Sequence, residues 1–173
     1  MSHEEMSAHD GVEMQIAQLK DQAYEFLHEF KRARTSCAPA DFPWYPWESL
    51  GNFEHLNNLL SGANRDLRNL IGDLPVADVG AADGDVSFFL ERQGIVTDLV
   101  DYGPTNMNGL HGARLLKKAF DSKVEIHEMD LDSQFHWPRE RYGLVFFSGN
   151  SLPPEKSVLR AGVNGKGEQA CLD

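Results

Sequence analysis

A strand, a glycine-containing turn and the start of a helix follow one another between residues 76 and 85. The mostly apolar run Val76–Val79 predicts a buried strand, and Gly80 and Gly84 predict a tight turn because glycine tolerates positive φ. Downstream of this unit the sequence continues to alternate between strand-like and helix-like segments. Such alternation is typical of a parallel sheet covered by helices, so the chain is predicted to be of the α/β class.

Four strands are expected, each a short apolar run, and two helices lie between them. Helices are predicted over 85–93 and 105–120, the second weakened in its first half by Gly109 and Gly112. The order predicts a Rossmann-like doubly wound parallel sheet with helices on both faces, preceded by an N-terminal helical extension. The predicted strands cover residues 76–79, 96–101, 124–129 and 144–147.

Residues 1–72 are predicted to form a separate helical and aromatic region. Asp10 and Glu13 have the spacing of a helix cap, and an apolar stripe at steps of three and four predicts a helix up to Arg34. Short helices are expected around residues 53–60 and 67–71, the second ended by Gly72. The stripe consists of Val12, Ile16, Leu19, Ala23, Phe26, Leu27 and Phe30.

The segment 39–47 between these helices is rich in proline and aromatic residues, so neither a regular helix nor a central strand is expected there. Four rings would be costly to leave in water. Two interpretations remain open, and each can hold for different rings: a loop packed on the core, or a lid over a ligand pocket. The rings belong to Phe42, Trp44, Tyr45 and Trp47.

The turn after the first strand and the acid after the second predict a nucleoside-cofactor site at the carboxyl ends of parallel strands. Glycine lets the backbone approach a ligand closely, and Asp101 can accept hydrogen bonds from ribose hydroxyls. A dinucleotide fingerprint requires glycine where Ala82 and Asp85 stand. A carboxylate at the helix start would repel a pyrophosphate, whereas Asp78, Asp83 and Asp85 suit a ligand with positive charge.

The segment from Asp78 to Gly84 resembles motif I of class I S-adenosylmethionine-dependent methyltransferases, with Ala82 in place of the middle glycine. The likeness extends over about residues 40–147, through Trp44–Trp47 and 51–56 upstream and Asp130-Leu131 downstream. These segments are similar to a group of bacterial methyltransferase-domain proteins distantly related to enzymes that modify the wobble uridine of tRNA. The resemblance implies methyl transfer from S-adenosylmethionine to an unknown acceptor, either a small molecule or an RNA base.

The resemblance also implies which residues bind the cofactor, within 73–147. Asp101 would hold the ribose, and Asp78 is either a partner of the methionine ammonium group or a structural acid bonded to the backbone. Tyr102 would stack on adenine or pack against the strand ends, and Asp130 would contact adenine, whereas Asp132 could cap the following turn instead. The cofactor-binding residues expected on this basis are Asp78, Gly80, Ala81, Ala82, Gly84, Asp101, Tyr102, Asp130 and Leu131.

No catalytic residue and no metal site are predicted. Methyl transfer needs mainly an aligned nucleophile and sulfonium, so a general base is not required. The 2 cysteines and 7 histidines show no ligand spacing, and His127 and Glu128 alternate on a strand and cannot chelate together. His55 is a candidate for the substrate side of the site.

The composition restricts the classes of binding partner and the cellular location that can be expected. A net charge of -11 argues against a protein held on DNA or RNA phosphates by bulk charge. No run approaches about 18 apolar residues, so no membrane span is expected. The acidic N-terminus has no apolar core and is not a signal peptide, and a cytoplasmic location is therefore predicted.

Residues 148–173 depart from the resemblance, which implies a further helix and three further strands after residue 147. Reading residues 149–162 one nucleotide later, with permitted codons, gives GILYHLKNPYYVLE, a family-like string. We therefore interpret residues 148–173 as an out-of-frame, disordered tail on a truncated domain; the alternative is a genuinely divergent, short C-terminus. Leu144–Phe147 would then be an apolar edge through which the chain can self-associate. For the function, two alternatives to a methyltransferase remain. The second is a non-catalytic, nucleoside-binding or unstable remnant of a methyltransferase, and the third is an NAD-binding protein.

Overall fold

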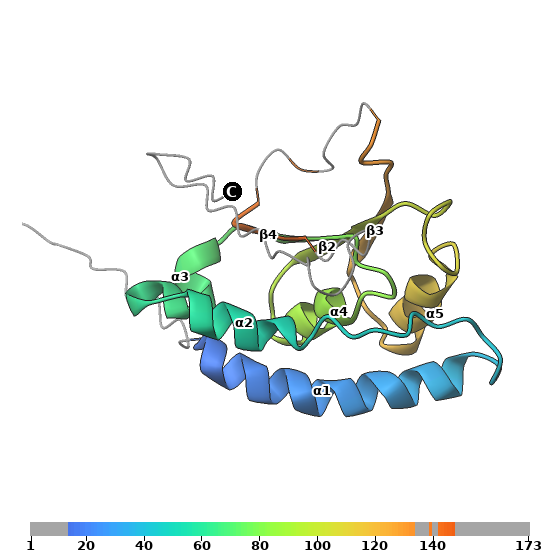
Figure 1. Ribbon diagram of the computed structural model, residues 1–173, viewed down its shortest axis with the longest axis horizontal. Helices are drawn as coiled ribbons and strands as arrows, with labels where there is room; N and C mark the ends of the chain where they lie inside the picture. Colours follow the sequence, from blue (N-terminus) through green and yellow to red (C-terminus); the bar gives the residue numbers. More distant parts are fainter. Residues whose placement is uncertain (1–13, 134–138, 140–141, 148–173) are drawn as a thin grey trace, which may run out of the picture.

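The computed structural model describes residues 14–133, 139 and 142–147 (Figure 1). The predicted cap at Asp10, the stripe residue Val12 and the predicted tail 148–173 lie outside these residues. The helices are α1 (Ile16–Cys37), α2 (Asn52–Leu59), α3 (Leu67–Ile71), α4 (Asp85–Arg92) and α5 (His111–Ala119), with a 3-10 turn at Gly62–Arg65. The strands are β1 (Val76–Val79), β2 (Thr97–Asp101), β3 (Glu125–Glu128) and β4 (Leu144–Phe147).

The four strands form one parallel sheet in the order β3-β2-β1-β4. The order runs outward from β1 to β3 and then returns to the other side of β1, which is the doubly wound pattern predicted from the sequence. Right-handed crossovers place α4 and α5 on the same face of the sheet, and α1 and α2 lie on that side too (Figure 1). The α/β class and the parallel sheet are therefore confirmed.

The opposite face differs from the expectation of helices on both sides, because no helix within the described ranges covers it. There Tyr142 is buried with Val79 and Val100, and the partly buried Met129 and Leu131 pack against them. Strand alternation explains the division, since Leu99 points to the helices whereas Val100 points to this second cluster.

The helical face holds the main core. The α1 stripe is buried as predicted at Ile16, Leu19, Ala23, Phe26 and Phe30, although the helix ends at Cys37 rather than Arg34. Aromatic contacts then join the layers: Phe26 lies 5.7 Å from Phe89 of α4 between ring centroids. Phe53 of α2 contacts both Phe89 (5.1 Å) and Phe146 of β4 (5.8 Å). The N-terminal extension is thus part of the same core as the sheet.

Helix α5 begins at His111, so the predicted start at Thr105 is wrong. The preceding residues form turns, and Gly109 and Leu110 both have a φ of +64°. The Oδ1 of Asn106 accepts hydrogen bonds from the backbone N of Asn108 and of Leu110, at 3.1 Å each. An Asn side chain that bonds to the following backbone competes with helix formation, which explains the shortened helix.

The two sheet edges differ in charge. The β3 edge carries the exposed side chains of Glu125 and Glu128, whereas β4 is wholly apolar and Phe147 is 48% exposed. Among the described strands, β4 pairs only with β1. Self-association through this edge remains a prediction. No helix in the described ranges is long and apolar enough to cross a membrane.

Candidate functional site

The turn after β1 is built from left-handed backbone. Gly80, Ala82 and Gly84 have φ values of +69°, +53° and +85°. Ala82 therefore adopts a left-handed conformation that is usual for glycine, although alanine carries a side chain. This is the position at which the motif that the sequence resembles has its middle glycine. At Gly84 a Cβ would lie 2.6 Å from the Cδ1 of Leu99, so the absence of a side chain lets the turn pack directly on β2.

Asp101, at the end of β2, binds this turn directly. Its Oδ2 accepts a hydrogen bond from the backbone N of Ala82 at 2.8 Å and from the Nδ2 of Asn106 at 3.0 Å. Its Oδ1 accepts from the backbone N of Tyr102 at 2.7 Å. A carboxylate offers about four acceptor positions, so one remains on Oδ1. The structure thus brings together Ala82, Asp101 and Tyr102, three of the residues expected at the site.

Asp78 is buried beneath the turn and is only 1% exposed. Its Oδ2 accepts hydrogen bonds from the backbone N of Ser87 at 3.1 Å and from the Ser87 Oγ at 2.7 Å, while its Oδ1 is buried and has no hydrogen-bond partner in the part of the chain that the structure describes. Burial raises the pKa of Asp78 to about 7, against the lowering effect of the Ser87 hydroxyl. An unpartnered buried carboxylate oxygen is costly, which makes Asp78 the clearest ligand candidate at the site.

The other two acids of the motif are occupied by the chain itself. Asp83, 2% exposed, accepts hydrogen bonds from Arg34 (2.9 Å), the backbone N of Tyr45 (2.7 Å) and Asn108 (2.7 Å). The two carboxylate oxygens of Asp83 therefore join α1, the aromatic segment and the loop before α5. A Cβ on Gly112 would lie 2.8 Å from the Asn108 Nδ2, so this loop approaches Asp83 only beside a glycine.

Asp85 closes the start of α4 in a similar way. Its Oδ2 accepts hydrogen bonds from the backbone N of Ser49 at 2.7 Å and of Leu50 at 3.3 Å, and its Oδ1 from that of Val86 at 3.0 Å. Burial nevertheless raises the pKa of Asp85 to about 6. Of the three acids expected to suit a cationic ligand, only Asp78 keeps an oxygen without a partner among residues 14–133, 139 and 142–147.

The aromatic segment divides between the two interpretations left open. Trp44 packs against the core, where the Arg34 guanidinium lies 5.3 Å from its ring centroid. Tyr45 instead lies beside the site, where its backbone N donates to the Oδ2 of Asp83 at 2.7 Å. Burial and the charges of Asp101, Asp83 and Asp85 raise the pKa of its hydroxyl. Trp44 is thus a core ring, while Tyr45 fits the interpretation as a wall of the site.

The remaining expected residues lie beyond β3. The Oδ1 of Asp130 accepts a hydrogen bond from the backbone N of Asp132 at 3.0 Å, so Asp130 itself caps the following turn. Leu131 packs against the second-face core. The backbone N of Met129 donates to the carbonyl of Asp101 at 2.9 Å and holds this segment next to the end of β2. His55 is exposed on α2.

Sequence reasoning missed three polar residues that support the acids: Ser87 under Asp78, Asn106 beside Asp101, and Arg34 beside Asp83. The Asn106-Met-Asn108-Gly pattern is a turn signal, which a helix assignment over 105–120 had overridden. The Arg34–Asp83 contact joins residues far apart in the sequence, and the Ser87–Asp78 contact runs from α4 back to β1, so neither follows a pattern of short period. Comparisons with protein-family models, with curated proteins and with solved structures find no match for this chain.

Proposed function

We propose that residues 73–147 form the cofactor-binding half of a class I S-adenosylmethionine-dependent methyltransferase. The observation that carries the proposal is the hydrogen bond between the Ala82 N and the Asp101 Oδ2, which joins the turn after β1 to the acid after β2. In open parallel sheets ligands bind at the carboxyl ends of the strands, where this contact lies.

The described residues fit such a cofactor. The free acceptor position of Asp101 suits a ribose hydroxyl, and the unpartnered Oδ1 of Asp78 suits an ammonium group. Tyr102 and Leu131 offer apolar surface near the strand ends for adenine, and Asp130 adds an acceptor. The sulfonium of S-adenosylmethionine supplies an activated methyl group, and the chain's part is to orient and shield it. The methyl acceptor is either a small molecule or an RNA base, and the net charge of -11 disfavours the RNA base. We assign no catalytic residue.

Two other functions compete with this one. An NAD-binding protein is disfavoured because the Asp85 carboxylate sits at the start of α4, where a pyrophosphate would need free N–H groups. A non-catalytic remnant would keep the nucleoside site without turnover.

Calorimetric titration of the full chain with S-adenosylhomocysteine and, separately, with NAD tests the proposal. Tighter binding of S-adenosylhomocysteine is expected, since the Asp78 carboxylate can accept from an ammonium group, whereas the Asp85 carboxylate at the start of α4 would repel a pyrophosphate. Tighter NAD binding would overturn it. Binding of S-adenosylhomocysteine without methyl transfer to any small nucleophile or tRNA would support the remnant.

Replacing Asp101 by alanine should weaken S-adenosylhomocysteine binding by about 1–3 kcal/mol, because a charged hydrogen-bond acceptor is lost. Asn106→Ala is the comparison variant: it keeps the carboxylate but removes the Asn106 contacts with Asp101, with the Ala82 carbonyl and with the loop before α5, so a smaller loss than for Asp101→Ala is expected. Asp73→Ala, an exposed acid before β1, should change nothing. Equal losses for Asp101→Ala and Asn106→Ala would show that Asp101 only braces the loop.

A further inference from the structure

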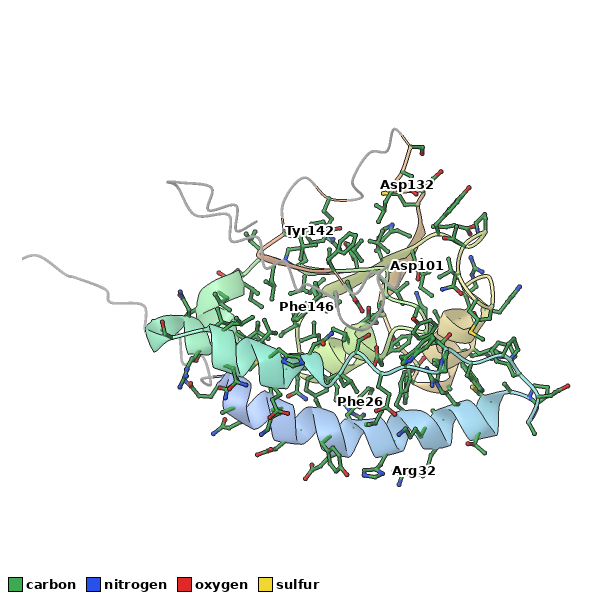
Figure 2. All side chains as sticks on the ribbon, viewed as in Figure 1. Phe26, Arg32, Asp101, Asp132, Tyr142 and Phe146 are labelled. Carbon is green, nitrogen blue, oxygen red and sulfur yellow. The ribbon has the colours of Figure 1, made fainter. Side chains whose placement is uncertain are left out.

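Three metal-ligating side chains meet on the sheet face opposite the helices, away from the turn after β1. Asp98 lies on β2, and Glu125 and His127 lie on β3. Asp98 pairs with Glu125 in the parallel register, and His127 is two residues further along, so all three side chains share one face. Figure 2 shows Tyr142, which binds Asp98, on the opposite side of the sheet from Phe26.

The ligand atoms are spaced as a metal ion requires. One atom from each residue lies within 4.8 Å of the others. The Nε2 of His127 is 3.5 Å from the Oε2 of Glu125 and 3.8 Å from the Oδ1 of Asp98. A tetrahedral ion with bonds of about 2.1 Å keeps its ligand atoms about 3.4 Å apart. The two distances from His127 are within a few tenths of an ångström of this spacing, and the oxygens of Asp98 and Glu125 lie within 4.8 Å of each other.

The imidazole nitrogen lacks another partner. The His127 Nε2 is shielded from solvent and has no hydrogen-bond partner among the described residues. Its two neighbours are carboxylates, which only accept hydrogen bonds when ionised, and both lie beyond hydrogen-bond distance. The Nε2 of His127 therefore faces one oxygen from each of two carboxylates, and three ligand atoms around one point can be bridged by a cation.

Asp98 is held in the orientation that the site needs. Its Oδ2 accepts hydrogen bonds from the Nε of Arg139 at 2.5 Å and from the hydroxyl of Tyr142 at 2.8 Å, and the carboxylate is 1% exposed. The Oδ1 has only a long contact with Arg139, at 3.5 Å. Outer partners of this kind fix the orientation of metal-binding carboxylates. Arg139 and Tyr142 thus bind the Oδ2 of Asp98 and leave its Oδ1 directed at His127.

We infer that Asp98, Glu125 and His127 bind one divalent transition-metal ion, through Asp98 Oδ1, Glu125 Oε2 and His127 Nε2. One imidazole and two carboxylates suit Zn²⁺ or a neighbouring ion better than Ca²⁺ or Mg²⁺, which prefer oxygen ligands alone. The ion would fasten β3 to β2 and, through Asp98, to Arg139 and Tyr142. The inference does not depend on the proposed function, because the cluster lies on the other face of the sheet.

The test is a titration of the untagged, chelator-treated full chain with Zn²⁺, followed by calorimetry and repeated with Co²⁺, whose visible absorption reports the geometry. One ion per chain and a raised Tm are expected. Glu125→Gln and His127→Gln should each weaken Zn²⁺ binding more than tenfold. Glu128→Gln, on the same strand but pairing with Arg114, removes the same charge and should bind like the wild type.

Both substituted ligands lie at a partly exposed edge, with Glu125 63% and His127 24% exposed, so the variants should fold. Far-UV circular dichroism checks this. No Zn²⁺ uptake by the wild type would overturn the site. Equal Zn²⁺ binding by the wild type and His127→Gln would overturn it too, because the ion would then be held by other histidines.

Discussion

Replacing Arg34 by methionine should lower the free energy of unfolding by about 3 kcal/mol, because the substitution leaves the Asp83 carboxylate buried without its cation. The Arg34 Nη2 lies 2.9 Å from the Asp83 Oδ2, and the two side chains are only 15% and 2% exposed. Tyr45 and Asn108 still donate to Asp83, so the expected loss is near the lower end for a broken buried pair. Urea unfolding measures it.

Lys31→Met on the same helix is the matched control. Lys31 pairs with Glu48 at the surface, where both side chains are more than a third exposed, and an exposed pair contributes about 0.5 kcal/mol. Adding Asp83→Asn to Arg34→Met should recover part of the loss, since the uncompensated charge disappears. Equal losses from Arg34→Met and Lys31→Met would contradict the view that Asp83 needs a cation.

Asp78→Asn should have opposite effects on stability and on binding at pH 8. The folded-state pKa of Asp78 is raised to about 7, above its unfolded value near 4. Its contribution to stability is therefore fully present below about pH 4 and is lost as pH rises through 7. Asparagine carries no charge, so the variant should gain about 2 kcal/mol relative to the wild type between pH 5 and pH 8. Binding of S-adenosylhomocysteine should weaken by about 1–3 kcal/mol.

The change with pH is the quantity to measure, because it cancels the constant cost of the unpaired amide N–H groups of asparagine. Unfolding at pH 5, 6, 7 and 8 gives it directly. The charge of Asp85 contributes to the raised pKa of Asp78, so the measured change with pH includes the coupling between these two acids. Unchanged binding by Asp78→Asn would make Asp78 a structural acid. A stability difference that does not vary with pH would mean that its pKa is ordinary.

Patterns with a short period were sufficient to predict the strands and α1. The strands β1 and β4 begin and end where the apolar runs do, and the stripe of α1 is buried at Phe26 and Phe30 because a period of 3.6 residues places them on one side. Asp101 could be placed beside the turn because parallel strands end at the same edge of the sheet. These inferences depend only on local geometry and strand direction.

Contacts between distant residues could not be predicted. Sequence alone does not reveal that Asp83 contacts Arg34. The sequence therefore predicts that the Asp83 carboxylate faces a positively charged ligand, whereas its cation belongs to α1. The Asp98 cluster was missed for a related reason: His127 was compared with its neighbour Glu128, although Glu125, two residues away, shares its face. A check of alternate positions on strands would have found half of that cluster.

The position of β1 between β2 and β4 sets the order in which the sheet can assemble. The β1–α4–β2 and β2–α5–β3 units are short crossovers, so their strands meet after small loops have closed. The pairing of Val76 with Leu144 must close a much longer loop, and its entropy cost is met only when the core residue Phe146 reaches Phe53. Substitutions in β4 should accordingly speed unfolding more than they slow folding. We therefore expect β4, which pairs with β1 beside the candidate site, to be the last strand to join the sheet.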